Sequence, residues 1–156
     1  MFVGYRYYDK RAIEPLFPFG YGLSYTTFEY RNLRVPEKIA VGESVPVSVE
    51  VTNVGQRAGA ETVQLYVGDE ATTEVVRPVK ELEGFRKVTL APGETQTVTF
   101  TLAPRALSYY DIHRHDWAST PGTHRIFIGS SSRDIRLARD FEWTAAEAPP
   151  HSRGGP

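Results

Sequence analysis

The candidates for metal binding or catalysis in this chain are a short His-Arg-His-Asp run and a few dispersed aspartates. His113 and His115 lie two positions apart, so on a strand both imidazoles would face the same side and could share a metal ion with Asp116. Arg114, however, would place a cation in the middle of such a site, and no further ligand is evident. The run is therefore more typical of a polar hairpin tip, with a metal site as the alternative. We expect no metal and no other cofactor.

The composition limits the class of partner that the chain can bind. Its 156 residues include 18 basic and 19 acidic side chains, interspersed along the sequence, for a net charge of -1. This balance argues against nucleic acid or an anionic membrane as a partner. The absence of cysteine excludes disulfides and thiolate metal sites, and no apolar run reaches the roughly 18 residues of a membrane span. If Met1 is the true start, we expect a cytoplasmic protein, because no secretory signal follows it; otherwise the location is open.

Apolar residues at every second position predict a chain built of β-strands. The four valines between positions 45 and 51 alternate with polar residues or proline, which is the pattern of a half-buried strand. Similar patterns predict strands near residues 28–35, 63–67, 82–90, 97–102, 107–112, 123–129 and 135–143. Residues 91–94, Ala-Pro-Gly-Glu, predict a type II turn. No helix is expected. Residues 69–79 lack any period and predict a mobile or interface-forming loop.

The first thirty residues differ from this regular pattern because they hold ten of the nineteen aromatic side chains. Pro15, Pro18, Gly20 and Gly22 exclude a long helix or strand there. The aromatic rings must therefore lie on an irregular, extended segment. Each buried aromatic ring removes roughly 150–250 Å² from water, so we expect this segment to pack against a partner surface.

Residues 15–26, which read PLFPFGYGLSYT, resemble the junction that leads into the C-terminal fibronectin type III-like domain of glycoside hydrolase family 3, the β-glucosidases and β-xylosidases. Further similar segments follow in the order of that family and extend the resemblance over about residues 2–143; they are residues 51–55, 59–67, 77–82, 84–85, 90–94 and 130–135. One departure is Thr123-His124, which follows Pro-Gly where the family usually has an aromatic residue. That departure puts the packing of the strand near residue 123 in question.

The resemblance implies that the catalytic parts lie outside this sequence. Family members resemble three-part enzymes, with an aspartate nucleophile on a barrel domain, an acid/base carboxylate on an α/β sandwich domain, and a domain like this one last. Neither of the first two parts has a counterpart here. The chain is expected to be a fragment without glycosidase activity of its own, taken from a parent enzyme that could be secreted. Its expected partners are the barrel and α/β sandwich domains, with carbohydrate contacted only indirectly.

Several aspartates and both tryptophans are candidates for the chemistry of that family. A retaining glycosidase needs two carboxyl groups about 5–5.5 Å apart. Asp9 more simply orders the junction by hydrogen bonds, with a contact near a neighbouring domain's sugar pocket as the alternative. Asp111 and Asp134 are expected to be acceptors in turns. Trp117 and Trp143 could stack on sugars, although tryptophans near strand residues more often belong to a core.

The sequence thus predicts an all-β, fibronectin type III-like β-sandwich of seven or eight strands. Residues 1–27 form the junction, residues 28–144 the sandwich, and residues 145–156 a disordered tail. We expect the junction to pack on the α/β domain through its apolar side chains, namely Phe2, Tyr5, Tyr7, Tyr8, Phe17, Phe19, Tyr21 and Leu23. The expected function is that of a non-catalytic structural module. The alternative is a free-standing carbohydrate-binding or adhesion domain.

Overall fold

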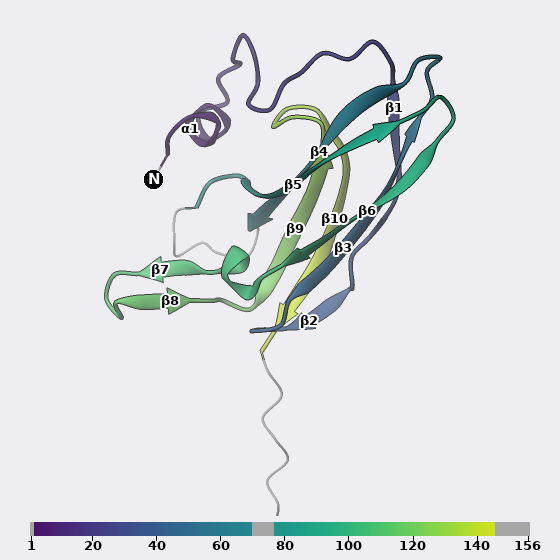
Figure 1. Cartoon of the computed structure of the whole chain (residues 1–156). Coiled ribbons are helices and arrows are strands. Elements are labelled where there is room, and N and C mark those ends of the chain that lie inside the picture. Colours follow the sequence, from purple (N-terminus) through teal and green to yellow (C-terminus); the bar gives the residue numbers. More distant parts are fainter. Residues whose placement is uncertain (1, 70–76, 146–156) are drawn as a thin grey trace, which may run out of the picture.

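Two packed β-sheets form the body of the molecule in the computed structural model, which describes residues 2–69 and 77–145 (Figure 1). One sheet has the strand order β1-β3-β6 and the other the order β2-β10-β9-β4-β5, while β7 and β8 form a separate hairpin. The strands of the first sheet are β1 (Phe28–Arg34), β3 (Val45–Asn53) and β6 (Thr95–Leu102). Those of the second are β2 (Lys38–Ala40), β4 (Gly59–Asp69), β5 (Glu81–Leu90), β9 (Gly122–Gly129) and β10 (Ile135–Thr144). The hairpin joins β7 (Tyr109–Asp111) to β8 (Asp116–Ala118).

The core lies between the two sheets and is built by the predicted alternation. The four valines of β3 are almost completely buried, and the residues between them are half-buried or exposed. In the antiparallel pairing with β6, Val45 lies opposite Leu102 and Val49 opposite Val98. Leu65 and Ile128, which are paired across β4 and β9, face the valines from the other sheet. The prediction of a fibronectin type III-like β-sandwich is confirmed, with eight strands in the two sheets.

The turn between β5 and β6 has the predicted conformation. Gly93 has a φ of 75°, which a side chain would disfavour, and the amide of Glu94 donates to the Ala91 carbonyl at 3.0 Å. The Glu94 carboxylate in turn accepts a hydrogen bond from the Ala91 amide at 2.7 Å. These contacts are local, which is why the sequence predicted the turn correctly.

Asn53, at the end of β3, is a buried polar residue that joins the two sheets to the junction. Its amide group donates to the Leu90 carbonyl at 2.9 Å, and its side-chain oxygen accepts from the Thr26 hydroxyl at 2.7 Å. The same oxygen accepts from the Gly55 amide at 3.1 Å. A buried amide satisfied on both its groups fixes its neighbours in one arrangement. The last residues of the junction are therefore anchored to the sandwich.

Three features of the secondary structure differ from the predictions, and the expectation that the chain has no helix is wrong. The first is a helix in the junction, α1 (Tyr5–Lys10), and the second is a single 3-10 turn, η1 (Pro104–Leu107). The third is the short strand β2, which pairs in parallel with β10. The strand expected at residues 107–112 consists of the end of η1 followed by the three-residue β7. Each of these elements has fewer than seven residues, so none leaves a readable period in the sequence.

Trp143 corrects one of the proposed sugar contacts. Its ring is only 1% exposed, and its Nε1 donates to the Ala40 carbonyl at 2.8 Å. The imidazole of His124, itself buried on β9, packs edge-to-face against it, with ring centroids 5.5 Å apart. The departure from the family pattern at Thr123-His124 therefore does not loosen this strand. Trp143 belongs to the core and has no surface on which a sugar could stack.

Several expectations concern parts of the chain that lie outside the described residues. These are most of the loop expected at residues 69–79, because residues 70–76 are not described, and residues 146–156 of the expected tail. Within the described ranges, none of the helices has the length and apolarity needed to cross a lipid bilayer.

Candidate interdomain interface

Helix α1 is held in place by the sandwich rather than by its own sequence. It has only six residues, its N-cap is Gly4, and no side chain caps it, so it would be marginal in isolation. The hydroxyl oxygen of Tyr5 accepts a hydrogen bond from the backbone amide of Leu82 on β5 at 2.7 Å. The guanidinium of Arg6 lies 3.0 Å from the carboxylate of Glu81 on the same strand. Both contacts tie the start of the helix to the edge of the five-stranded sheet.

Asp9 forms the centre of a buried charge cluster beneath the junction. Its Oδ2 lies 2.6 Å from the Nζ of Lys80, and its Oδ1 lies 2.9 Å from the Nε of Arg133. The Asp9 side chain is 4% exposed and that of Lys80 is 10% exposed. Arg133 also donates to the carbonyl of Ile13 at 2.9 Å, so it holds the junction at two points. With both carboxylate oxygens paired to cations, Asp9 orders the junction. Its contact with a sugar stays a prediction.

A second set of contacts fixes the middle of the junction. The rings of Tyr5 and Phe19 stack with centroids 4.8 Å apart, and Tyr5 meets Tyr66 of β4 edge-on at 6.0 Å. The carbonyl of Gly20 accepts from the Gln64 side chain at 3.1 Å. Gly20 has a φ of 78°, and a Cβ there would lie 2.3 Å from the Gln64 Oε1, so only glycine fits. Tyr5 and Phe19 therefore pack within this chain.

The opposite side of the junction carries exposed apolar side chains, which we call the outer junction surface and which comprise Leu16, Phe17, Tyr21, Leu23 and Tyr25. Leu16 and Leu23 are each 89% exposed, and the rings of Phe17 and Tyr21 lie 5.8 Å apart. Monomers rarely leave so many apolar side chains of one short segment in water unless the segment binds something.

The side chains predicted to pack between domains thus fall into two groups. Phe17, Tyr21 and Leu23 are on the outer junction surface, whereas Tyr5 and Phe19 contact the chain itself. The remaining three lie around α1: Phe2 is half-buried beneath Lys10, and Tyr7 and Tyr8 are exposed. That these side chains contact another domain stays a prediction.

The other aspartates are used by local structure. The Oδ1 of Asp111 accepts hydrogen bonds from the amides of His113 and Arg114 at 2.8 and 3.2 Å, and these bonds hold its pKa below the ordinary range. Asp134 accepts from the Ser130 hydroxyl and lies 2.8 Å from Arg136. Burial alone would raise the pKa of Asp134, but these two partners outweigh it and lower that pKa. Both residues are turn acceptors, as predicted.

The tip of the β7–β8 hairpin carries the His-Arg-His-Asp run. His115 adopts a positive φ of 53° at this tip. Among the described residues there is no group of three or more histidines, cysteines or carboxylates arranged to hold a metal ion. The run forms a polar hairpin tip, as the sequence favoured.

Trp117 is partly exposed on β8, but its ring is already in use. The guanidinium of Arg105 lies 4.1 Å from the ring centroid, and the ring of Tyr110 meets it edge-on at 5.8 Å. A sugar would have to displace Arg105 to reach that face of the indole. The sugar contact proposed for Trp117 stays a prediction.

Sequence reasoning missed the two cations that bind Asp9. Lys80 and Arg133 lie 71 and 124 positions from Asp9, and neither stands in a pattern that marks it as buried. Both fall within segments that carry the family resemblance, and this was the only signal that could have drawn attention to them.

Comparisons with known proteins agree with this architecture. A family model described as the fibronectin type III-like domain matches residues 61–132. The thermostable β-glucosidase B of Acetivibrio thermocellus is 56% identical over 138 residues, which cover 88% of this chain and 18% of the relative. The β-glucosidase BoGH3A of Bacteroides ovatus is 49% identical over 142 residues, covering 90% of this chain and 19% of the relative.

The solved structure of the GH3 β-glucosidase of Bifidobacterium adolescentis matches with a TM-score of 0.87 at 38% identity, over 99% of this chain and 23% of that one. The chain therefore spans about a fifth of the length of the curated relatives it matches, and it corresponds to the C-terminal part of their longer chains. The chain belongs to the fibronectin type III-like domains of glycoside hydrolase family 3.

Proposed function

We propose that this chain is a non-catalytic structural module of a β-glucosidase-type enzyme of family 3. It docks through its junction onto another domain of that enzyme, of the α/β sandwich type that the family resemblance implies, and so stabilises the catalytic part. The chain takes no direct part in the chemistry. The carboxylates that could have served catalysis are engaged in turns or in the charge cluster around Asp9.

The observation that carries this proposal is the two-sided construction of the junction. Its inner side is fixed to the sandwich by Asp9 and Tyr5, which lose most of their freedom in doing so. Its outer surface presents leucine, phenylalanine and tyrosine side chains to solvent without a partner in the described part of the chain. A rigid segment with an exposed apolar side is preorganised for docking, because little further entropy is lost when it binds.

A chimera tests the proposal directly. In the Acetivibrio thermocellus β-glucosidase, the segment that matches this chain is replaced by the chain itself, and hydrolysis of an aryl-β-glucoside is followed. We expect an active enzyme whose temperature of half-inactivation falls when Phe17→Ala and Leu23→Ala are combined, with the KM unchanged. Phe19 is not substituted, because its ring supports Tyr5 within this chain. Val54→Ala, at an exposed position outside the junction, is the matched control.

The isolated chain provides the second measurement. It should not hydrolyse the aryl-glucoside, and titration with glucose and short β-glucans should give no saturable heat. Turnover that is lost on Asp9→Asn or Asp111→Asn would refute a non-catalytic role. Sugar binding that is lost on Trp117→Ala would instead favour a carbohydrate-binding domain.

A further inference from the structure

A β-bulge on β5 singles out Glu83 on the same side of the molecule as the junction. In the pairing of β5 with β4, Gly84 lies opposite Leu65 and Leu82 lies opposite Tyr66, so Glu83 has no partner on β4. A bulge of this kind bends the strand and redirects the side chain of the extra residue. The neighbouring Leu82 amide donates to the Tyr5 hydroxyl, which links the bulge to α1.

The charges around the bulge are unequally paired. Glu81 binds both nearby cations, with Arg6 at 3.0 Å and Arg77 at 3.6 Å. Within the described part of the chain, Glu83 has neither an ion pair nor a hydrogen bond through its carboxylate. Partial burial raises the pKa of Glu83 to about 7, and the like charge of Glu81 adds to this, while Arg6 and Arg77 oppose it. Glu83 therefore has no direct partner for its carboxylate among the described residues, and the residue is exposed to solvent.

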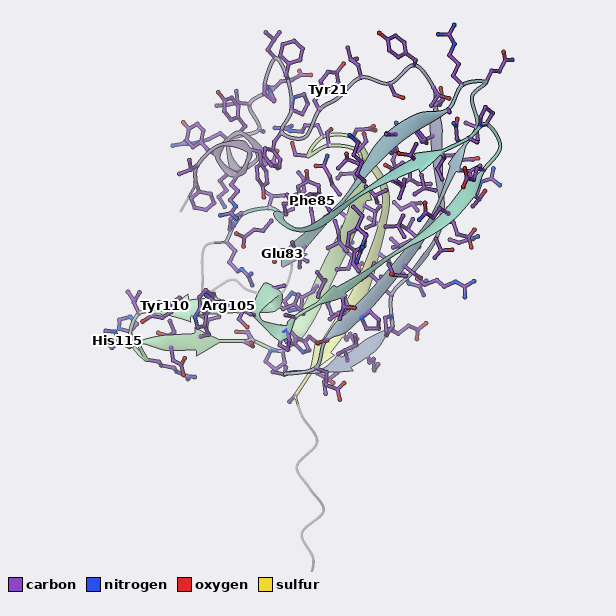
Figure 2. All side chains as sticks on the ribbon, in the orientation of Figure 1. Tyr21, Glu83, Phe85, Arg105, Tyr110 and His115 are labelled. Atoms are coloured by element: carbon purple, nitrogen blue, oxygen red, sulfur yellow. The ribbon has the colours of Figure 1, made fainter. Side chains whose placement is uncertain are left out.

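Glu83 lines a hollow of about 470 Å³ between the sandwich and the β7–β8 hairpin. Glu81 and Glu83 line it from β5, Arg105 from η1, and Trp117 from β8. The guanidinium of Arg105 lies on the Trp117 ring, and among the ion pairs of the described residues none joins Arg105 to Glu83. Figure 2 shows Glu83 and Phe85 between the junction and the hairpin, and Phe85 is 69% exposed.

The hairpin itself projects from the sandwich as a second arm (Figure 1). Its base is fixed by the hydrogen bond between the hydroxyls of Ser108 and Ser119, at 2.8 Å. Tyr110, Ile112 and Trp117 are exposed along it. A hairpin that carries three large exposed apolar residues has the composition of an interface rather than of a free surface loop.

We propose that the hairpin and the bulge together bind the same domain of the enzyme that the junction contacts. That domain places a lysine or arginine side chain against Glu83 and apolar side chains against Phe85 and the hairpin. This inference rests on the proposed function, because the occupant is another domain of the same enzyme. The unpaired carboxylate selects a cation as the group that enters the hollow. The junction and the hairpin then hold that domain from two sides.

The positions of the junction and the β7–β8 hairpin favour a protein domain over a small ligand as the occupant. In the view of Figure 2, Tyr21 of the outer junction surface lies above Glu83 and Phe85, and Tyr110 of the hairpin lies below them. The hollow beside Glu83 links the bulge to the hairpin, and the Tyr5–Leu82 hydrogen bond links the bulge to the junction. About four-fifths of the length of each curated relative lies outside the segment that this chain matches. The relatives therefore contain ample further polypeptide to occupy such a broad surface.

Hydrogen exchange compares the isolated chain with the chimera described above and needs no substitution. If the hairpin docks, amides of residues 109–118 exchange about tenfold or more slowly in the chimera than in the isolated chain. Slower exchange in the junction alone, with an unchanged hairpin, would overturn this inference and leave the proposed function intact. Unchanged exchange in both the hairpin and the junction would count against this inference and against the proposed function. Slowing in the isolated chain that increases with its concentration would identify a second copy as the occupant.

Charge reversal then tests the cation. Glu83→Lys in the chimera should shorten the half-life of activity at elevated temperature several-fold, because two cations would face each other in the hollow. Glu43→Lys, which makes the same charge change at an exposed position between β2 and β3, is the matched control and should leave the half-life unchanged. Equal effects of the two substitutions would mean that no basic group enters the hollow.

Discussion

Asp9 and Lys80 form an ion pair of 2.6 Å between side chains that are 4% and 10% exposed, although 71 residues separate them in the sequence. Charges removed from water cost several kcal/mol unless they are well paired. Each of these residues is therefore tolerated only when the other is in place. The pair permits one position of α1 on the sandwich and thereby determines which side of the junction faces outward.

Asp9→Asn should release the junction from the sandwich. The substitution leaves Lys80 and Arg133 without their carboxylate, and removing one member of a buried pair costs about 3–5 kcal/mol. Because α1 can detach while the sandwich stays folded, we expect the loss to appear as faster amide exchange in residues 5–13, by about a hundredfold for 3 kcal/mol.

Glu142→Gln is the control for that experiment. It removes the carboxylate that lies 3.0 Å from Lys38, in a pair whose side chains are mostly exposed. Such pairs contribute less than about 1 kcal/mol. An equal acceleration of exchange by both substitutions would show that the charge cluster around Asp9 does not hold the junction.

Leu65→Ala should destabilise the sandwich by about 2–4 kcal/mol, with Val49→Ala near the lower end, because both side chains are fully buried between the sheets. Thr99→Ala, on the exposed face of β6, should cost less than about 0.5 kcal/mol. Urea unfolding followed by circular dichroism measures all three. A cost at Thr99 as large as that at Leu65 would contradict the placement of the core.

Glu83→Gln should change how the stability of the isolated chain depends on pH. The folded chain raises the pKa of Glu83 from 4.5 to about 7, so folding favours the protonated form. The destabilisation due to Glu83 is thus absent below about pH 4.5, grows as the pH rises, and is complete above about pH 7. The melting temperature of the parent chain should fall relative to that of Glu83→Gln across this window. The difference should be modest because solvent reaches part of this side chain, and a constant difference would argue against the shifted pKa.

Leu16→Ser combined with Leu23→Ser should reduce the binding of a hydrophobic dye to the isolated chain. Both side chains are almost fully exposed, so their replacement removes apolar surface without opening a cavity. The melting temperature should therefore stay nearly constant while dye fluorescence falls. Val54→Ser, at another exposed position, should leave the fluorescence unchanged, and an equal decrease there would mean that the dye does not bind the outer junction surface.

Features that depend on short-range patterns could be predicted from the sequence. Alternation at positions 45–51 predicted β3 because a strand with one buried face requires apolar residues at every second position. The Pro-Gly pair predicted the turn at residues 91–94 through the backbone angles of those two residues. The prolines and glycines of the junction likewise excluded long regular structure there. Similar segments along the chain were sufficient to indicate the family.

Features that depend on contacts between distant residues could be seen only in the folded chain. Helix α1 forms because Tyr5 binds β5 and Asp9 binds Lys80 and Arg133. None of these partners is near the helix in sequence. The same contacts divide the junction aromatics into an inner and an outer group. Both groups contain phenylalanine and tyrosine, so residue type does not distinguish them. Trp143 was placed in the core by its position on β10, and Glu83 was redirected by the one-residue mismatch between β4 and β5. Burial, ion pairing and strand register are properties of the folded chain, because each arises when distant segments are brought together.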